Sequence, residues 1–189
     1  MELFQNEQID ISNLPQAKQL EMHGLEPSYK SVLLISRTIF TLILAVLTAI
    51  FVFVPMEDKP PSANYVAIGL FIFITIWGYV STIKGFHHKR YASREKDIVY
   101  SSGWLWKQTT IAPFNRVQHV SIAQGPIERQ FELSKLKIFT AGGKSSDMSI
   151  PGLNPETANK LKEYIVSKAL DEQSDEVTTL LTTADDEQE

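Results

Sequence analysis

Two long apolar segments dominate the pattern of hydrophobic and polar positions along the chain. Residues 38–54 contain no charged side chain over 17 positions, and residues 63–83 contain none over 21. A helix needs about 20 largely apolar residues to cross the hydrocarbon core of a bilayer, and the second segment meets this requirement alone. The first segment meets it when it is extended back to residue 32. The pattern therefore predicts membrane-spanning helices at about 32–54 and 63–83.

The extended first helix includes one charged residue, Arg37. We expect its aliphatic stem to lie along the helix while the guanidinium reaches the membrane interface. A buried core helix of a soluble domain is the alternative for either segment. Such helices seldom remain uncharged over this length, so the membrane interpretation is favoured.

A short polar turn separates the two apolar segments. Residues 55–62 include Pro60 and Pro61, which stop a continuous helix, so residues 31–83 form a helical hairpin. The turn has one lysine and two acids, whereas the outer flanks carry only bases, namely Lys30, Arg37, Lys84, Lys89 and Arg90. The positive-inside rule then predicts a multi-pass membrane protein with both termini in the cytoplasm. Because residues 1–30 are polar and no apolar run begins before about residue 32, we expect them to form a cytoplasmic N-terminal segment rather than a signal peptide.

Beyond residue 84 the pattern changes to short alternating segments rich in β-branched and aromatic residues, interrupted by glycine and proline. This pattern predicts strands at residues 91–94, 97–102, 104–111, 116–123, 135–140 and 148–150. A helical turn is expected at 126–133. The signal Asn154-Pro155-Glu156 begins a helix that an apolar stripe continues to Leu170. Residues 84–170 are therefore expected to form one cytoplasmic domain.

Charge and composition change this picture in three respects. The net charge is −4 because residues 171–189 hold eight acids and no base, whereas residues 84–144 carry +7. The terminal segment is therefore expected to be an acidic, disordered tail. The basic middle points to an acidic partner, and the adjacent anionic leaflet is a simpler partner than nucleic acid. The absence of cysteine excludes disulfides and thiolate chemistry.

Four spaced segments carry a resemblance: Gly103-Trp-Leu-Trp-Lys107, Pro113-Phe-Asn-Arg-Val-Gln118, Gln124-Gly-Pro-Ile-Glu-Arg-Gln-Phe-Glu-Leu133 and Ile138-Phe-Thr-Ala-Gly-Gly143. With these segments the chain resembles the bacterial pleckstrin-homology-like (PH-like) family, in which a two-helix transmembrane hairpin often precedes one such domain. The resemblance covers about residues 25–170. It implies an α+β, mostly-β domain of bent antiparallel sheets closed by a C-terminal helix. Glu132 stands where relatives commonly have glycine.

The resemblance also implies a location in the bacterial cytoplasmic membrane and no established enzymatic activity. The matching segments and the bases that directly follow the second span together supply seven candidates for contact with lipid or a partner: Arg116, Arg129, Lys107, Lys89, Arg90, Trp104 and Trp106. A guanidinium at Arg116 or Arg129 can hold phosphate or carboxylate through two hydrogen bonds. Alternatively, each arginine ties strand ends together by bonding carbonyls, Glu128 or Glu132.

The two tryptophans and the juxtamembrane bases have open interpretations as well. Trp104 and Trp106 lie two apart on one face of a predicted strand, where they either cover the core or project as an aromatic contact patch. Lys89 and Arg90 directly follow the second span and His87-His88. They are expected to form a basic collar that attracts anionic headgroups, with about 1 kcal/mol from each basic residue.

No motif favours a catalytic, metal or cofactor site. Gly143-Lys144-Ser145 ends like a phosphate-binding loop, but Ile138 stands where that motif requires glycine, so a turn between strands is expected. His87 and His88 are adjacent and have no third ligand near them, which favours the basic collar over a metal site. His119 has no serine or aspartate at triad spacing and is expected to pack structurally.

Two functional hypotheses follow. The first is a non-enzymatic membrane-anchored module that mediates lipid-proximal protein–protein or self-association at the cytoplasmic face. The second is an accessory subunit of an envelope transporter or stress-defence complex. The expected partners are lipids of the anionic leaflet and either a second copy or another membrane protein of the same family, without nucleic acid or cofactor. An enzyme acting on lipids is disfavoured because no nucleophile–base pair or paired carboxylates stand at usable spacing.

Overall fold

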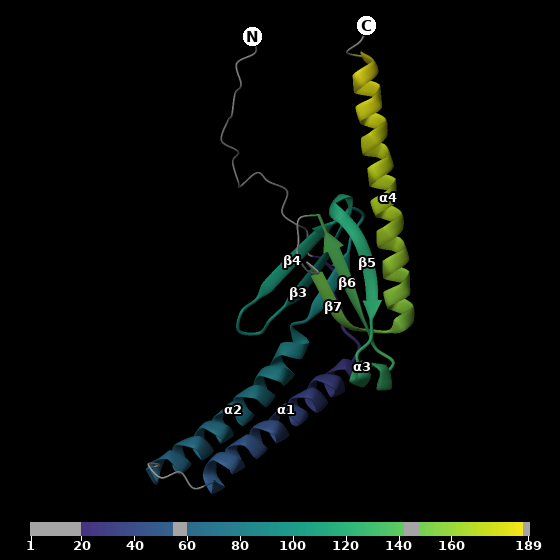
Figure 1. The fold of residues 1–189 in the computed structure, drawn as a ribbon. Helices are drawn as coiled ribbons and strands as arrows, with labels where there is room; N and C mark the ends of the chain where they lie inside the picture. Colours follow the sequence, from purple (N-terminus) through teal and green to yellow (C-terminus); the bar gives the residue numbers. More distant parts are fainter. Residues whose placement is uncertain (1–19, 55–59, 142–147, 187–189) are drawn as a thin grey trace, which may run out of the picture.

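A computed structural model describes residues 20–54, 60–141 and 148–186 and places a helical hairpin beneath a two-sheet domain (Figure 1). The elements are β1 (His23–Gly24), α1 (Ser28–Phe53), α2 (Ser62–His87), β2 (Arg90–Ser93), β3 (Asp97–Ser102), β4 (Gln108–Pro113), the 3-10 helix η2 (Phe114–Arg116), β5 (Val117–Ala123), α3 (Pro126–Gln130), β6 (Ser134–Thr140), β7 (Met148–Leu153) and α4 (Pro155–Asp186). Among the described residues, one antiparallel sheet has the order β1-β2-β3-β4 and the other β5-β6-β7.

The hairpin is formed by α1 and α2, each of 26 residues. At 1.5 Å per residue each helix is about 39 Å long, which exceeds the hydrocarbon thickness of a bilayer. Both helices are apolar enough to cross a membrane, and their large hydrophobic side chains are exposed from Ile35 to Val54 and from Tyr65 to Ile83. Such a surface is stable in lipid and unstable in water. The predicted hairpin is therefore confirmed, with α1 beginning before residue 32 and α2 continuing beyond residue 83.

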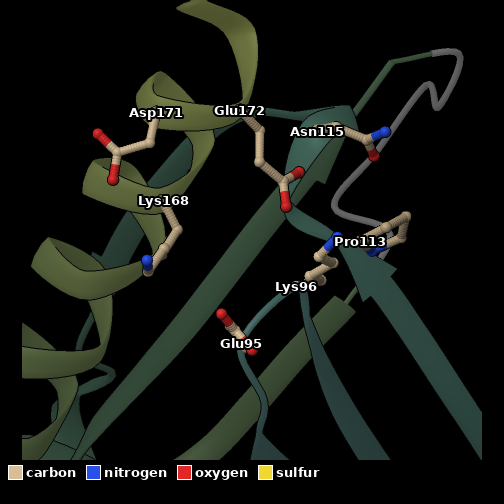
Figure 2. Close-up of a pocket in the computed structure, with 7 residues that line it drawn as sticks. All are labelled: Glu95, Lys96, Pro113, Asn115, Lys168, Asp171 and Glu172. Atoms are coloured by element: carbon tan, nitrogen blue, oxygen red, sulfur yellow. The ribbon is translucent and has the colours of Figure 1, made fainter. Parts of the chain in front are cut away.

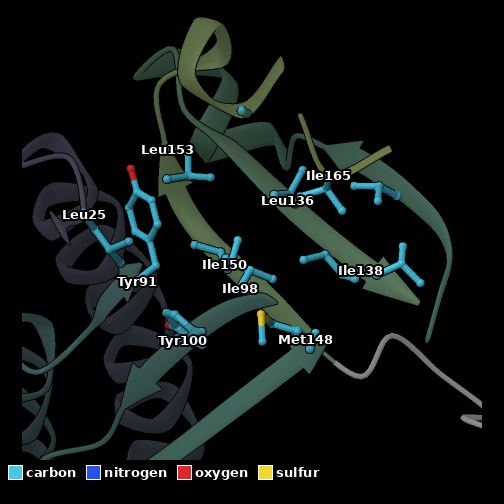
Figure 3. Packing of buried hydrophobic residues seen from close by; sticks show 14 of the residues in the cluster. Leu25, Tyr91, Ile98, Tyr100, Leu136, Ile138, Met148, Ile150, Leu153 and Ile165 are labelled. Atoms are coloured by element: carbon cyan, nitrogen blue, oxygen red, sulfur yellow. The ribbon is translucent and has the colours of Figure 1, made fainter. Parts of the chain in front are cut away.

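The core lies between the two sheets and α4 (Figure 3). Alternate residues of β6 and β7 point into it, and its most buried members include Ile98, Leu136, Ile138, Ile150 and Ile165, all with no exposed surface. The helix α4 closes the core by packing against η2, β5 and β6. Successive side chains of a strand point in turn to the core and to solvent, and this explains the period-two alternation that predicted these strands.

The described part of the N-terminal segment, residues 20–30, packs against this domain, whereas the sequence pattern assigns residues 1–30 to a separate segment. β1 pairs with β2, and the Glu26 amide donates to the Gly152 carbonyl at 3.0 Å. Leu25, Tyr29 and Val32 are buried in the core, although the last two belong to the first turns of α1. A two-residue strand is too short for its alternation to be visible, which is why the sequence pattern missed it.

Most predicted strands appear within one to three residues of their predicted bounds, but the one predicted at 104–111 is wrong. Residues 103–107 form a turn, and β4 runs from Gln108 to Pro113. Gly103 has φ of 97°, and a Cβ there would overlap the Trp106 carbonyl oxygen, so the chain reverses at this position. Trp104 and Trp106 therefore do not share the face of a strand.

The predicted disorder of residues 171–189 is also wrong over its described part. α4 begins as expected, with the Glu156 amide bonded to Asn154 Oδ1 at 2.9 Å, and it continues to Asp186. Extending an existing helix requires no new nucleation, so a docked first half favours helix in a polar continuation. The continuation runs away from the hairpin (Figure 1).

Glu132 is the one non-glycine residue with positive φ, 51°, in the described chain. A side chain in this conformation costs about 1–2 kcal/mol, which glycine avoids. We expect Glu132→Gly to raise the free energy of unfolding by about 0.5–1 kcal/mol, because the greater freedom of the unfolded chain offsets part of the gain. Gln130→Gly, in the helical turn α3, is the matched control and should lower it. Denaturant unfolding of the two variants checks the opposite signs.

Tyr100 is a buried titratable group in β3. Its burial, followed by the charge of Tyr29, raises its pKa from 10.0 to about 12. The unfolded state then releases the proton first, so stability is full below about pH 10 and is lost as the pH rises to about 12. We expect Tyr100→Phe to weaken this alkaline loss, measured by unfolding at stepped pH. Tyr65→Phe, at an exposed tyrosine, should leave the loss unchanged.

Candidate functional site at the junction of hairpin and domain

The turn between β3 and β4 rests on the end of α2. The Trp104 ring lies 6.2 Å from the Trp77 ring, and the Lys84 ammonium lies 4.6 Å from the centroid of Trp104. Contacts of this kind combine aromatic packing with cation–π attraction. Trp104 therefore fixes the turn against the helix, and neither original interpretation, core or free patch, describes it fully.

The rest of the turn is exposed beside the hairpin. Trp106 is 84% exposed and Leu105 62% exposed, and both line a cavity of ≈ 320 Å³. Its other walls come from the end of α2, the start of the sheet domain and the turn itself: Ser81, Gly85, Lys89, Ser102, Gly103 and Trp104. Leu105 was not among the sequence candidates, although its position between two tryptophans is a usable signal.

Three predicted bases lie around this junction. Lys89 and Arg90 connect α2 to β2, and Lys107 follows the exposed turn directly. Burial and the nearby positive charge of Lys135 lower the pKa of Lys89. Both effects disfavour the charged form of Lys89. A negative group beside it would stabilise that form, so an anion is electrostatically favoured at this position.

The structure separates the two candidate arginines. Arg116 precedes β5 and Arg129 lies in α3, beyond the opposite end of the strand, on the hairpin side of the domain (Figure 1). Both side chains are exposed, and within the described residues neither makes a hydrogen bond or ion pair. The tie to Glu128 that sequence reasoning left open is absent, since Glu128 accepts from the Gly125 amide at 2.8 Å and pairs with Lys135 at 3.4 Å. Arg129 belongs to the junction side and Arg116 does not.

Arg37 departs from the expectation that it reaches the interface. Its Nη2 donates to the Ile74 carbonyl of α2 at 2.6 Å, and a Cβ at Gly78 would overlap its guanidinium. The arginine therefore points across the hairpin at the position where α2 has no side chain. A glycine in the span is the sequence signal for such an approach, but residues 63–83 contain both Gly69 and Gly78, and only the structure shows that Gly78 faces Arg37.

A further cavity lies elsewhere, between α4 and the turn joining β2 to β3 (Figure 2). It measures ≈ 570 Å³ and is lined by Glu95, Lys96, Pro113, Asn115, Lys168, Asp171 and Glu172. Its mixed charges form no ion pair with one another, and no group of described residues there or elsewhere has the makings of a metal site. It is a polar surface recess on the side away from the junction.

The histidines show packing and capping contacts. His119 stacks on Phe139 with ring centroids 4.1 Å apart, and His88 Nδ1 lies 2.8 Å from the Lys84 carbonyl. These contacts agree with the structural interpretation of His119. The motif Gly143-Lys144-Ser145 lies outside the described residues.

The hairpin, the two sheets and the closing helix together match a known family. A family model described as "Bacterial PH domain" matches residues 32–169, well over half of the chain. The chain belongs to the bacterial PH domain family. This confirms the resemblance and the fold class predicted from sequence, and the matched region of the bacterial PH domain model includes both hairpin helices.

A named relative in turn supports the membrane character of this bacterial PH domain protein. The chain is 38% identical over 76 residues to the "UPF0699 transmembrane protein YdbS" of Bacillus subtilis (strain 168). The match covers 40% of this chain and 46% of the relative, so the chain spans about half the length of the relative. No solved structure matches the chain significantly. Family and relative together describe a PH-like domain in a transmembrane protein family, and neither description states a reaction.

Proposed function

We propose that the chain is a non-enzymatic membrane-anchored module that mediates lipid-proximal protein–protein or self-association at the cytoplasmic face. One observation carries the proposal: Trp104 clamps the β3–β4 turn onto α2 and thereby presents Leu105 and Trp106 beside the apolar hairpin. Tryptophan favours the membrane–water interface, where its apolar ring and its N–H group are both accommodated. The turn is suited to that depth.

The charge distribution supports the same placement. Lys84, Lys89, Arg90, Lys107 and Arg129 belong to the junction side, whereas the turn of the hairpin at the other end carries two acids and one lysine. Each base near an anionic leaflet contributes about 1 kcal/mol of attraction. Together with the positive-inside rule, this favours a multi-pass protein of the bacterial cytoplasmic membrane with both termini in the cytoplasm.

A domain held in this position is suited to recognise what lies beside it in the membrane. Only two residues, His88 and Lys89, connect α2 to β2, and β1 and α1 tie the other side of the domain to the hairpin. The proposed partners are anionic lipids together with a second copy or another membrane protein of the family. The alternative role, an accessory subunit of an envelope transporter or stress-defence complex, is the same module with a dissimilar partner.

A crosslinked pull-down of the full-length protein from native membranes, followed by mass spectrometry, tests the association. Recovery of the chain itself, or of one stoichiometric membrane protein, is the expected result. The second outcome identifies the complex in which the chain is an accessory subunit. Recovery of the uncrosslinked monomer alone, at native expression level, contradicts the proposal.

Lipid selectivity gives a second prediction, which uses the three tryptophans of the chain as reporters, since all lie at the junction. In vesicles that contain a minor fraction of brominated phosphatidylglycerol, quenching measures how far this lipid is enriched around them. We expect Lys89→Gln combined with Arg129→Gln to reduce the enrichment about thirtyfold, at about 1 kcal/mol for each of the two charges. Arg116→Gln combined with Lys168→Gln, which also removes two charges but on the side away from the junction, is the charge-matched control and should leave it unchanged. Equal loss in both proteins would show that only net charge matters.

A further inference from the structure

The guanidinium of Arg37 lies inside the apolar part of the hairpin, although the Arg37 backbone follows Ile35, the first exposed large hydrophobic residue of α1, by only two positions. It stands opposite Gly78, and Gly78 precedes Ile83, the last exposed large hydrophobic residue of α2, by five positions. At 1.5 Å per residue the guanidinium is about 7.5 Å below that level. Its bond to Ile74, one turn further from the domain, turns it away from the interface rather than toward it.

The charge of Arg37 has no anion in the described chain. A guanidinium has five N–H donors, and within the described chain that of Arg37 contacts one carbonyl, that of Ile74, and the ring of Phe40 at 5.2 Å. Its Nε is buried without a hydrogen-bond partner. The helix sequences Ser28–Phe53 and Ser62–His87 contain no aspartate or glutamate. An ionised group in hydrocarbon normally pairs with an opposite charge or lines an aqueous path.

A cavity of ≈ 450 Å³ lies beside this group. One stripe of α2 and the arginine itself line it: Arg37, Phe73, Ile74, Trp77, Gly78, Ser81 and Thr82. Gly78 keeps the space open, because a side chain there would displace the guanidinium. The remaining donors of Arg37 therefore have room for an acceptor from outside the chain.

We infer that this cavity receives the carboxylate of an aspartate or glutamate from a transmembrane helix of a different membrane protein. Charge complementarity selects the occupant. A second copy has no acid in either helix, so it cannot neutralise Arg37. A lipid phosphate stays in the headgroup layer, outside the hydrocarbon in which this guanidinium lies. The inference rests on the membrane placement proposed above, and it favours the accessory-subunit role.

The test uses the full-length protein in vesicles of zwitterionic phosphatidylcholine and a synthetic transmembrane probe. The probe is a leucine-rich helix with one glutamate placed five residues from one end of its apolar stretch, and the control probe has glutamine there. Energy transfer between labelled protein and labelled probe gives the binding constant. We expect the glutamate probe to bind about tenfold more tightly than the glutamine probe, as an interhelical polar contact in lipid warrants.

Two substitutions locate the effect. Arg37→Leu should abolish the difference between the probes, and it should insert normally because it removes a charge from the span. Arg37→Lys should retain part of the difference. Equal binding of the two probes to the unmodified protein overturns the inference, as does loss of the difference when phosphatidylglycerol is added, since an anionic lipid would then occupy the site. Membrane seating of the turn at Leu105 is measured separately, so failure here leaves the proposed function standing.

Discussion

Replacing Gly152 by alanine is expected to destabilise the domain by about 3 kcal/mol, the sum of a left-handed backbone and an overpacked core. Gly152 lies in β7 with φ of 64°, and a Cβ there would overlap the ring of Tyr29. The carbonyl of Gly152 also accepts a hydrogen bond from the Glu26 amide, so the substitution weakens the contact between the segment that precedes α1 and the domain. Urea unfolding in lipid nanodiscs, followed by near-ultraviolet circular dichroism, measures the loss.

Gly24→Ala is the matched control for this prediction. Gly24 lies in β1, and an added Cβ meets no atom within 4 Å. Its stability should change by about 0.5 kcal/mol or less. Tyr29→Leu should make Gly152→Ala less costly, because the two changes share one contact. A Gly152→Ala protein as stable as the Gly24→Ala protein would contradict the packing described between α1 and β7.

Replacing Phe114 by alanine is expected to cost about 3–5 kcal/mol and to release α4. Phe114 has no exposed surface, and its ring meets Tyr164 of α4 edge to face, with centroids 5.9 Å apart. η2 and β5 are the elements on which α4 packs most extensively. Hydrogen exchange of the α4 amides over residues 158–170 should accelerate together with the drop in stability, because the helix loses its central anchor.

Asn115→Ala, at the exposed neighbour of Phe114, should leave both the exchange rates and the stability nearly unchanged. If Phe114→Ala lowers stability but α4 exchanges as in the unmodified protein, α4 is held by β5 and β6 rather than by η2. Unchanged stability would show that Phe114 does not fill the core.

The features predicted correctly from sequence are those with a strong local signal. An uncharged run such as residues 63–83 has one stable environment, and alternation in Lys135-Leu-Lys137 marks a strand with one buried face. The sequence predicts that a strand ends at Gly103. The length of the following turn, however, depends on the close approach of the Trp106 carbonyl to Gly103, which the sequence pattern does not reveal. β4 was displaced for this reason.

The features that were missed depend on contacts between distant parts of the chain. β1 forms because β2 lies beside it, and Arg37 turns inward because Gly78 leaves space on the facing helix. For the candidate site, local sequence found Trp104, Trp106 and the collar, yet it grouped Arg116 with Arg129. Only the strand between them reveals that one lies on the hairpin side and the other does not.

The most direct test of membrane seating uses the absence of cysteine from the chain, which permits labelling at a single introduced site. A nitroxide is attached at Leu105→Cys in the β3–β4 turn and, separately, at Asn115→Cys on η2. The collision rates of each label with oxygen and with a water-soluble nickel chelate are then measured in anionic vesicles. A label at 105 that favours oxygen, with a label at 115 that favours the chelate, is the predicted result. Chelate access at 105 equal to that at 115 would place the turn in water and contradict the seating of the domain on the membrane.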